Sequence, residues 1–196
     1  MASAAGRHTK DNAVEVWKEF EHNEITHSAA HHLMAIDDLV QKFGYARVSD
    51  VARRLNITRG SVSISLQPLK KAALIVQDEN HHLQLSEAGR ELVAAIKTKR
   101  LLIQRLFHEV LGVARAQAEI DACKLEHLIS NETAGRMVSF LRFVDSDHAR
   151  ARAFLDGWSG FDPACQHEPT QCPSCESSCL AQNVQVSRGG GEVARR

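Results

Sequence analysis

Residues 49–69 carry the pattern that most constrains the fold: two short helices joined by a tight turn. The turn is predicted at Asn56 and Ile57, and the small Ala52 stands where the second helix would cross the first. Apolar residues at helical spacing would face inward on the two helices, namely Val51, Ala52, Leu55, Val62, Leu66 and Leu69. This spacing is typical of a helix-turn-helix.

A β-hairpin is predicted directly after these helices. Ser49 and Thr58 are expected to cap the two helices, the first ending at Leu55 and the second near residue 73. Stretches 74–77 and 82–85 favour strand and flank a polar turn at residues 78–80. Pro68 lacks a backbone donor and should bend or weaken the second helix. The hairpin converts the helix-turn-helix into a winged helix, with residues 78–82 as the wing.

The rest of the chain is predicted to be helical, so the expected fold class is mainly α. One apolar stripe around Leu33 and Ile36 stops at Gly44, and another begins after a Ser86 cap, runs toward Val110 and ends at Gly112. Amphipathic helices are also expected near residues 116–129 and 132–143.

Charge is segregated although the net charge is zero. Residues 40–75 hold seven Lys and Arg against Asp50 alone, so 7 − 1 = +6, whereas residues 1–38 hold three against seven acidic residues, so 3 − 7 = −4. A basic segment between acidic ones is the electrostatic footprint of a nucleic-acid-binding unit. A solvated basic helix face, or a winged helix that binds protein, are the alternatives.

The residues expected to contact duplex DNA lie on or beside the second helix, where short hydroxyl side chains allow close approach to phosphates and base edges. They are Arg47, Ser49, Thr58, Arg59, Ser61, Ser63 and Gln67.

A possible metal site lies in a later helix, where Cys123 precedes Glu126 by three residues and His127 by four. On a helix these side chains share one face, so they can converge on one ion. Sulfur, oxygen and nitrogen together suit a divalent first-row metal. The alternative is that Cys123 is simply buried as a small apolar residue and that the other two side chains face solvent.

The chain resembles the DtxR/MntR family of iron- and manganese-dependent repressors over about residues 28–145. The resemblance rests on residues 32–39, 44–50, 85–90 and 109–113 and, most specifically, on Ala-Cys-Lys-Leu-Glu-His at 122–127. It implies a homodimer that binds a double-stranded DNA operator and represses metal-uptake genes when the ion is present. It also implies a regulator rather than an enzyme. A metalloenzyme is the alternative from another class, but no general base with a supporting partner is found near these residues.

The resemblance further implies that a ligand from the first helix of the winged domain joins Cys123, Glu126 and His127. That position is His31, where relatives carry Met or Asp. Met34 stands where manganese-type relatives place a carboxylate, which favours Fe²⁺ and leaves Mn²⁺ as the second choice. An ancillary family site is not expected, because its His and Glu positions hold Arg100 and Gln104. Arg100 is expected instead to pair with Glu119, which stands at a further ancillary position.

Four cysteines crowd the C-terminus outside the family pattern. Cys165, Cys172, Cys175 and Cys179 are expected to share one metal centre, an iron–sulfur cluster or a Zn²⁺ ion. A redox or oxygen sensor that uses this cluster as its switch is a further alternative, as is an oxidisable tail.

These features together predict five segments. They are a disordered tail at 1–12, a winged-helix DNA-binding domain with an N-terminal helix at 13–86, a helical dimerisation and metal-binding domain at 87–155, a cysteine-rich extension at 156–180 and a flexible tail at 181–196. No signal peptide or membrane span is recognised, so a cytoplasmic protein without a membrane partner is expected.

Overall fold

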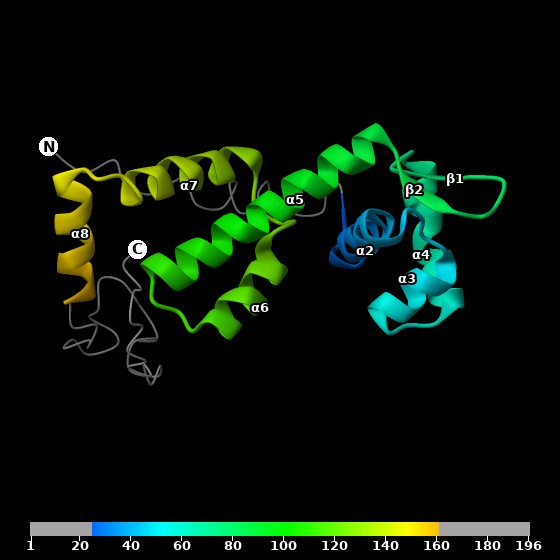
Figure 1. Cartoon of the computed structure of the whole chain (residues 1–196), viewed down its shortest axis with the longest axis horizontal. Helices are drawn as coiled ribbons and strands as arrows, with labels where there is room; N and C mark the ends of the chain where they lie inside the picture. The colour runs from blue at the N-terminus through cyan, green and yellow to red at the C-terminus, as the bar shows by residue number, and fades with distance from the viewer. Residues whose placement is uncertain (1–24, 161–196) are drawn as a thin grey trace, which may run out of the picture.

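The computed structural model describes residues 25–160. The predicted tails, the helix expected before residue 25 and the four C-terminal cysteines lie outside these residues. The winged unit consists of α2 (His27–Phe43), α3 (Val48–Leu55), α4 (Arg59–Lys71), β1 (Ile75–Gln77) and β2 (Leu83–Leu85). It is followed by α5 (Glu87–Arg105), a π-helical turn η1 (Leu106–Val110), α6 (Arg115–Leu125), α7 (Asn131–Val144) and α8 (Ala149–Ser159). The mainly helical fold class is confirmed (Figure 1).

The winged unit folds around one apolar core shared by its helices and its hairpin. Leu33 and Ile36 of α2 meet Val51, Val62 and Leu66 of the helix-turn-helix, and all five are almost completely buried. The two strands pair antiparallel, with Ile75 opposite Leu85. At the start of β2, a β-bridge between Leu83 and Ala46 ties the hairpin to the segment before α3.

The chain changes direction in the winged unit at residues with positive φ, two of which were predicted turn or end positions. Gly44 (φ 79°) ends α2 as predicted, and Asn56 (φ 56°) ends α3 in the turn of the helix-turn-helix. Glycine adopts this conformation without steric cost, and asparagine tolerates it better than most residues. The turn at Asn56 was therefore readable from the sequence.

The N-cap predictions are confirmed at two positions and wrong at one. Thr58 and Ser86 cap α4 and α5 by accepting from the backbone N–H groups of Ser61 and Gly89 at 3.1 and 3.0 Å. Ser49 does not cap α3. The cap is Arg47, whose carbonyl accepts the first helical bonds, so Ser49 lies inside the first turn and is half-buried.

The helix carrying Pro68 continues to Lys71. Because Pro68 lies in the last turn of α4, its missing donor removes only the bond to Ile64, and the residues after it still close the turn. The backbone N–H of Ala72 donates to the carbonyl of Pro68 at 2.9 Å.

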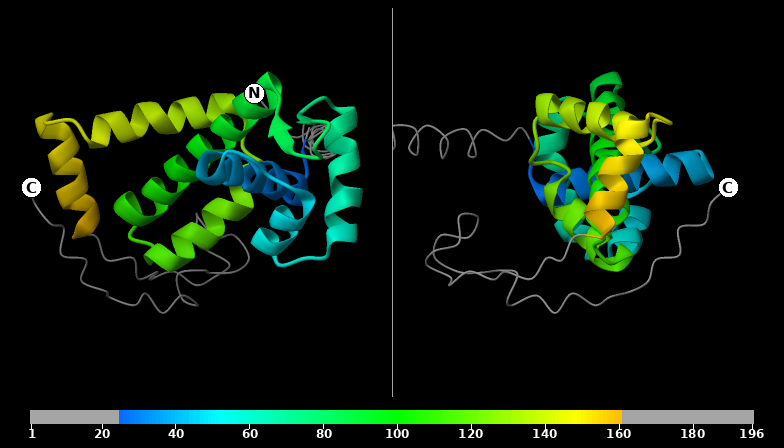
Figure 2. Two further views of the ribbon diagram at one scale, coloured as in Figure 1. Left: turned by 45° about the vertical axis from the view of Figure 1, so that its right-hand side comes forward. Right: turned by 90° about the vertical axis from the view of Figure 1, so that its left-hand side faces the viewer.

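Helix α5 leaves the wing and continues into the second half of the molecule, where α6 packs along it and α7 and α8 follow (Figures 1 and 2). The π-turn η1 and helix α8 were not predicted. Helix α6 ends at Leu125, earlier than the predicted 129, because a turn intervenes before Ser130 caps α7. Helix α8 runs across residues 155 and 156, between which the boundary of the cysteine-rich extension was predicted. The Trp158 indole on this helix donates to the Val110 carbonyl at 2.6 Å.

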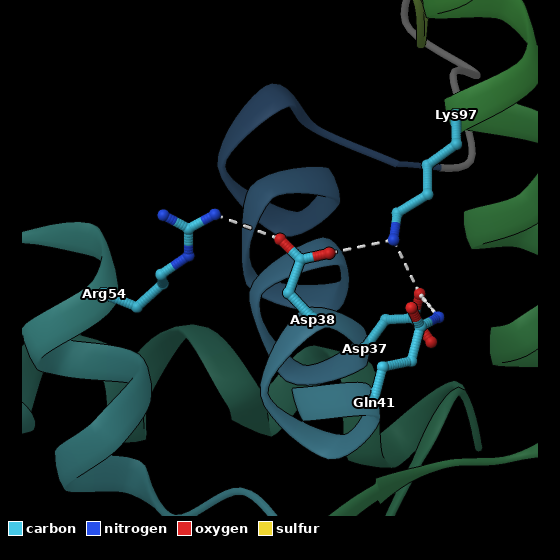
Figure 3. A network of polar contacts seen from close by, with 5 residues as sticks. All are labelled: Asp37, Asp38, Gln41, Arg54 and Lys97. Carbon is cyan, nitrogen blue, oxygen red and sulfur yellow. Dashed lines mark hydrogen bonds and ion pairs between the residues drawn. The ribbon is translucent and has the colours of Figure 1, made fainter. Parts of the chain in front are cut away.

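A polar network fastens α5 to the winged unit (Figure 3). The ammonium of Lys97 on α5 donates to Asp37 at 2.7 Å and to Asp38 at 2.9 Å on α2, and Asp38 also accepts from Arg54 on α3 at 3.1 Å. Three helices are therefore joined through two adjacent carboxylates. None of the helices in the described part of the chain is long and apolar enough to cross a bilayer.

Candidate metal centre and nucleic-acid interface

The start of α2 and the end of α6 meet at one place, although they are far apart in sequence. The Cys123 sulfur lies 3.3 Å from the His31 Nε2 atom. Both residues are half-buried. Two of the four expected ligands, one from each half of the molecule, are thus in direct contact.

A residue that the sequence analysis missed, His27, joins this pair. One ligand atom each from His27, His31 and Cys123 lie within 4.8 Å of one another. The His27 ring centroid is 4.4 Å from that of His31 and 5.0 Å from that of His127. The signal was present in the sequence, because His27 precedes His31 by four residues and so shares its helix face.

His127 lies against this cluster with an unsatisfied nitrogen. Its Nδ1 atom is buried and has no hydrogen-bond partner. Burial and the neighbouring His27 lower the pKa of His127. Burial, together with His27 and Arg100, also lowers the pKa of His31. Both imidazoles are therefore biased toward the neutral form that binds metals.

Glu126 faces a different partner. It is fully buried, and its Oε2 atom lies 2.7 Å from the Nε atom of Arg100 on α5. The two atoms form an ion pair, but neither of them makes a well-aligned hydrogen bond. Burial raises the pKa of Glu126, against the opposing effect of Arg100. The expected pairing of Arg100 with Glu119 is wrong, since Glu119 is exposed on α6.

Met34 belongs to the apolar core and not to the metal cluster. Only 6% of its surface is exposed, among the inward-facing residues of α2. A thioether in this position packs as a core side chain, so no ligand is available where manganese-type relatives place a carboxylate.

The donor groups fit a divalent transition metal. A thiol and two imidazoles of lowered pKa, one of which has an orphaned buried nitrogen, form a set of borderline and soft donors. Ligand atoms of a tetrahedral N and S site are roughly 3.5 Å apart. The 3.3 Å separation of His31 and Cys123 is close to that spacing. From a separation of 4.8 Å, the ligand atom of His27 would need to move by roughly 1.3 Å to reach it.

The residues expected to contact DNA follow the outer side of α4 and the start of α3. Six of them are exposed and Ser49 is half-buried; the exposed ones are Arg47, Thr58, Arg59, Ser61, Ser63 and Gln67. Thr58 is also the cap of α4, and its hydroxyl lies 2.8 Å from that of Ser61.

Arg47 is held beside the wing. Its guanidinium lies 3.0 Å from the Nε2 atom of His82 and 5.3 Å from the Tyr45 ring centroid. The other ring nitrogen of His82 lies 3.1 Å from an Asp78 oxygen. Arg47 is thereby placed at the junction between α3 and the hairpin, where the two parts present one surface.

Two arginines of this segment have acidic partners: Asp50, which the count of +6 already subtracts, and Asp38, which lies outside the segment. Arg53 pairs with Asp50 at 3.3 Å and Arg54 with Asp38 at 3.1 Å. The sequence analysis also missed Ile64, which is 75% exposed on α4. An apolar side chain so exposed on a recognition helix can contact a thymine methyl group.

Comparison with known proteins finds one family that is similar to the second half of the chain. Residues 86–153 match the family model of the iron dependent repressor, metal binding and dimerisation domain. The chain is 29% identical over 119 residues to the iron-dependent repressor IdeR of Mycobacterium tuberculosis, an alignment that covers 61% of this chain and 52% of IdeR. It is 28% identical over 118 residues to the HTH-type transcriptional regulator MntR of Geobacillus kaustophilus, which covers 60% of this chain and 83% of MntR.

A solved structure shares the fold. The metal-dependent transcriptional regulator MtsR aligns with a TM-score of 0.54 and 23% identity over 59% of this chain and 54% of that one. The chain spans about half the length of the IdeR relatives it matches.

Proposed function

Because the chain belongs to the DtxR/MntR family of metal-dependent transcriptional regulators, we propose that it is a DNA-binding repressor whose affinity for an operator depends on a bound divalent metal. The family consists of regulators and not of enzymes. A cytoplasmic location is part of the same proposal.

The observation that carries this proposal is the contact between His31 and Cys123, because it joins the winged unit to α6. A metal would be held by His31, Cys123 and His127, with Glu126 as the fourth ligand expected from the sequence pattern. The ion supplies a crosslink whose strength depends on its concentration. Such a crosslink shifts the population toward one orientation of the winged unit.

The responsive ion is proposed to be Fe²⁺, with Mn²⁺ second. A thiolate and imidazoles are softer donors than the oxygen ligands that Mn²⁺ prefers. Position 34 supports the same order, because it holds a buried methionine and offers no carboxylate to Mn²⁺.

A homodimer is proposed from the second half of the chain. Several large apolar side chains are exposed there, namely Leu101, Leu111, Ile120, Phe143, Phe154 and Trp158. A second copy would bury such a surface, and it would present two recognition helices to successive major grooves about 34 Å apart.

Electrophoretic and fluorescence binding assays with metal-replete and chelated protein test the function. The protein should bind duplex DNA from the promoter of its own gene only when metal is present. Its affinity should fall steeply as salt rises, because Arg and Lys displace counterions from the DNA. The His127→Ala variant should lose the metal response and keep its fold, since one ligand is removed at a half-buried position.

The opposite results are equally clear. Binding that does not depend on salt, or no binding under any metal condition, contradicts the DNA-binding role. A His127→Ala variant that responds to Fe²⁺ with unchanged affinity contradicts the metal site.

The role of the C-terminal cysteines is proposed from the sequence alone. We propose that Cys165, Cys172, Cys175 and Cys179 hold an iron–sulfur cluster, or else Zn²⁺, because three of them follow a Cys-x2-Cys-x3-Cys spacing. The absorption spectrum of anaerobic protein separates the two, since Zn²⁺ has a filled d shell and gives no visible colour.

A further inference from the structure

We propose that His27 is a ligand of the metal centre and takes the place that the sequence pattern assigns to Glu126, so that three imidazoles and one thiolate surround the ion. This inference rests on the proposed function, because it names the ligands of the same site. Three observations support it.

The first observation is the position of His27. Its ligand atom lies within 4.8 Å of those of His31 and Cys123, a set to which neither Glu126 nor His127 belongs. His27 also contacts the His127 ring, at a centroid distance of 5.0 Å. It is therefore the side chain that touches both of the other imidazoles. Thr26 caps α2 by accepting from the Ala29 N–H at 3.2 Å, which fixes the helical turn that carries His27.

The second observation is that Glu126 already has a cation. Arg100 lies 2.7 Å from its carboxylate in a fully buried position. A guanidinium does not lose its proton in a protein, so Arg100 keeps its positive charge beside the Glu126 carboxyl group. Removing one partner of a buried pair leaves an uncompensated charge, which costs more than the pair gains. For Glu126 to bind the metal, Arg100 would have to leave and find other partners.

The third observation is the chemistry of the donors that remain. The thiolate of Cys123 contributes one negative charge, and the three imidazoles are neutral ligands. Four nitrogen and sulfur donors favour a tetrahedral ion of the Fe²⁺, Co²⁺ or Zn²⁺ group and disfavour Mn²⁺, which prefers oxygen. In this chain, the Arg100–Glu126 pair would form the wall of the site and not part of its coordination sphere.

Anaerobic titration with Co²⁺ tests the assignment, because cobalt bound to thiolate in a four-coordinate site absorbs strongly in the visible. The parent is the full-length chain with Cys165, Cys172, Cys175 and Cys179 replaced by serine, which leaves Cys123 as the single cysteine. His27→Gln should weaken Co²⁺ binding by more than about 100-fold, beyond the loss typical of a residue that only orients a ligand. Because His27 is exposed, its replacement leaves the core unchanged.

Two variants test the exclusion of Glu126. Glu126→Gln should keep the absorption bands and lose less affinity than His27→Gln, within the roughly 10–100-fold that a change outside the coordination sphere typically costs. The double variant Arg100→Met/Glu126→Met should do the same, and it leaves no unpaired buried charge if the single variant folds poorly. His81→Asn, on the wing, is the control for the loss of one surface histidine.

Unchanged Co²⁺ affinity in His27→Gln overturns the inference, and so does a loss in both glutamate variants that matches the loss in His27→Gln. These outcomes are independent of the proposed function. If Co²⁺ binds through His27 but has no effect on DNA binding, the regulatory role fails while the ligand assignment stands.

Discussion

Among the glycines of residues 25–160, Gly89 has the least room for a side chain. It lies in the first turn of α5, where that helix passes the end of α4 and the start of the hairpin. A Cβ atom at this position would lie 2.1 Å from the carbonyl oxygen of Leu74. That carbonyl also accepts from the N–H of Ser86 at 3.0 Å, so it cannot turn away without losing the bond. A glycine is required here for close approach and not for its φ angle.

We expect Gly89→Ala to lower the free energy of unfolding by about 1–3 kcal/mol, because the backbone must shift to relieve the overlap. Gly135→Ala is the matched control. Gly135 lies inside α7 with no atom within 4 Å of a new Cβ, so the change should stabilise the protein by about 0.5–1 kcal/mol through helix propensity. Urea denaturation measures both. Equal effects of the two substitutions would contradict the steric argument.

At the scale of the element, the network in Figure 3 couples three helices through charge. Burial would raise the pKa of Asp38, but hydrogen bonds from Lys97 and Arg54 outweigh it and lower that pKa. Burial likewise opposes the bonds from Asp37 and Asp38, which together raise the pKa of Lys97. The ionised forms of Asp38 and Lys97 are therefore favoured in the folded state.

A lowered carboxyl pKa stabilises the fold above the ordinary pKa of aspartate, and this stability is lost as pH falls through the lower, folded-state pKa. We expect Asp38→Asn to be less stable than the wild type at neutral pH, by about 0–1 kcal/mol for each partly exposed pair. The difference should disappear in acid, where wild-type Asp38 is protonated. Denaturation across a pH series checks this, with the exposed Asp147→Asn as control. A difference that persists below the native pKa of Asp38 would exclude the ionic explanation.

Elements whose boundaries depend on local chemistry were predictable. Helix α4 begins after Thr58, α5 begins after Ser86, and α2 ends at Gly44, because a hydroxyl cap or a left-handed glycine acts within a few residues. The π form of η1 escaped although the left-handed Gly112 follows it, because such a glycine marks a helix end and not the helix type. Helix α8 escaped because it has neither a hydroxyl cap nor a left-handed glycine. Helix α8 is held in part by a contact across 48 residues, from Trp158 to the Val110 carbonyl.

At the scale of the whole molecule, the proposed metal connects α2 of the winged unit to α6 of the helical half. Helix α5 is the segment of chain that passes between the two halves, and the Lys97 network lies on its winged side. The bound ion would thus add a second connection at a different point. Two connections restrict relative rotation more than one.

Metal binding should therefore stabilise the folded chain. At a free metal concentration about 100 times the dissociation constant, the free energy of unfolding should rise by about 2.7 kcal/mol, and a chelator should reverse the gain. Hydrogen exchange should slow at the start of α2 and the end of α6. Cys123→Ser, which removes the thiolate, should abolish both effects. An equal gain in that variant would show that the ion binds elsewhere.

The candidate site was only partly predictable from the sequence. The four-residue spacing of Cys123 and His127 is enough to predict that they share a helix face. His27 and His31 have the same spacing, but the sequence analysis did not use it. No periodic pattern could show that Arg100, 26 residues before Glu126, would reach its carboxylate. That pairing depends on how α6 packs along α5, which brings side chains together across the sequence.

Local features of the sequence suffice to predict the winged helix, the helical second half and the group of residues from which ligands are drawn. Apolar periodicity, caps and turns are local, and they act the same way in any chain that contains them. The tertiary structure alone decided which of those candidates meet. It placed His31 against Cys123 across 92 residues, added His27 to them and gave Glu126 a cation of its own. The physical reason is that coordination and ion pairing act over a few ångströms, and only the packing of α2, α5 and α6 sets those distances.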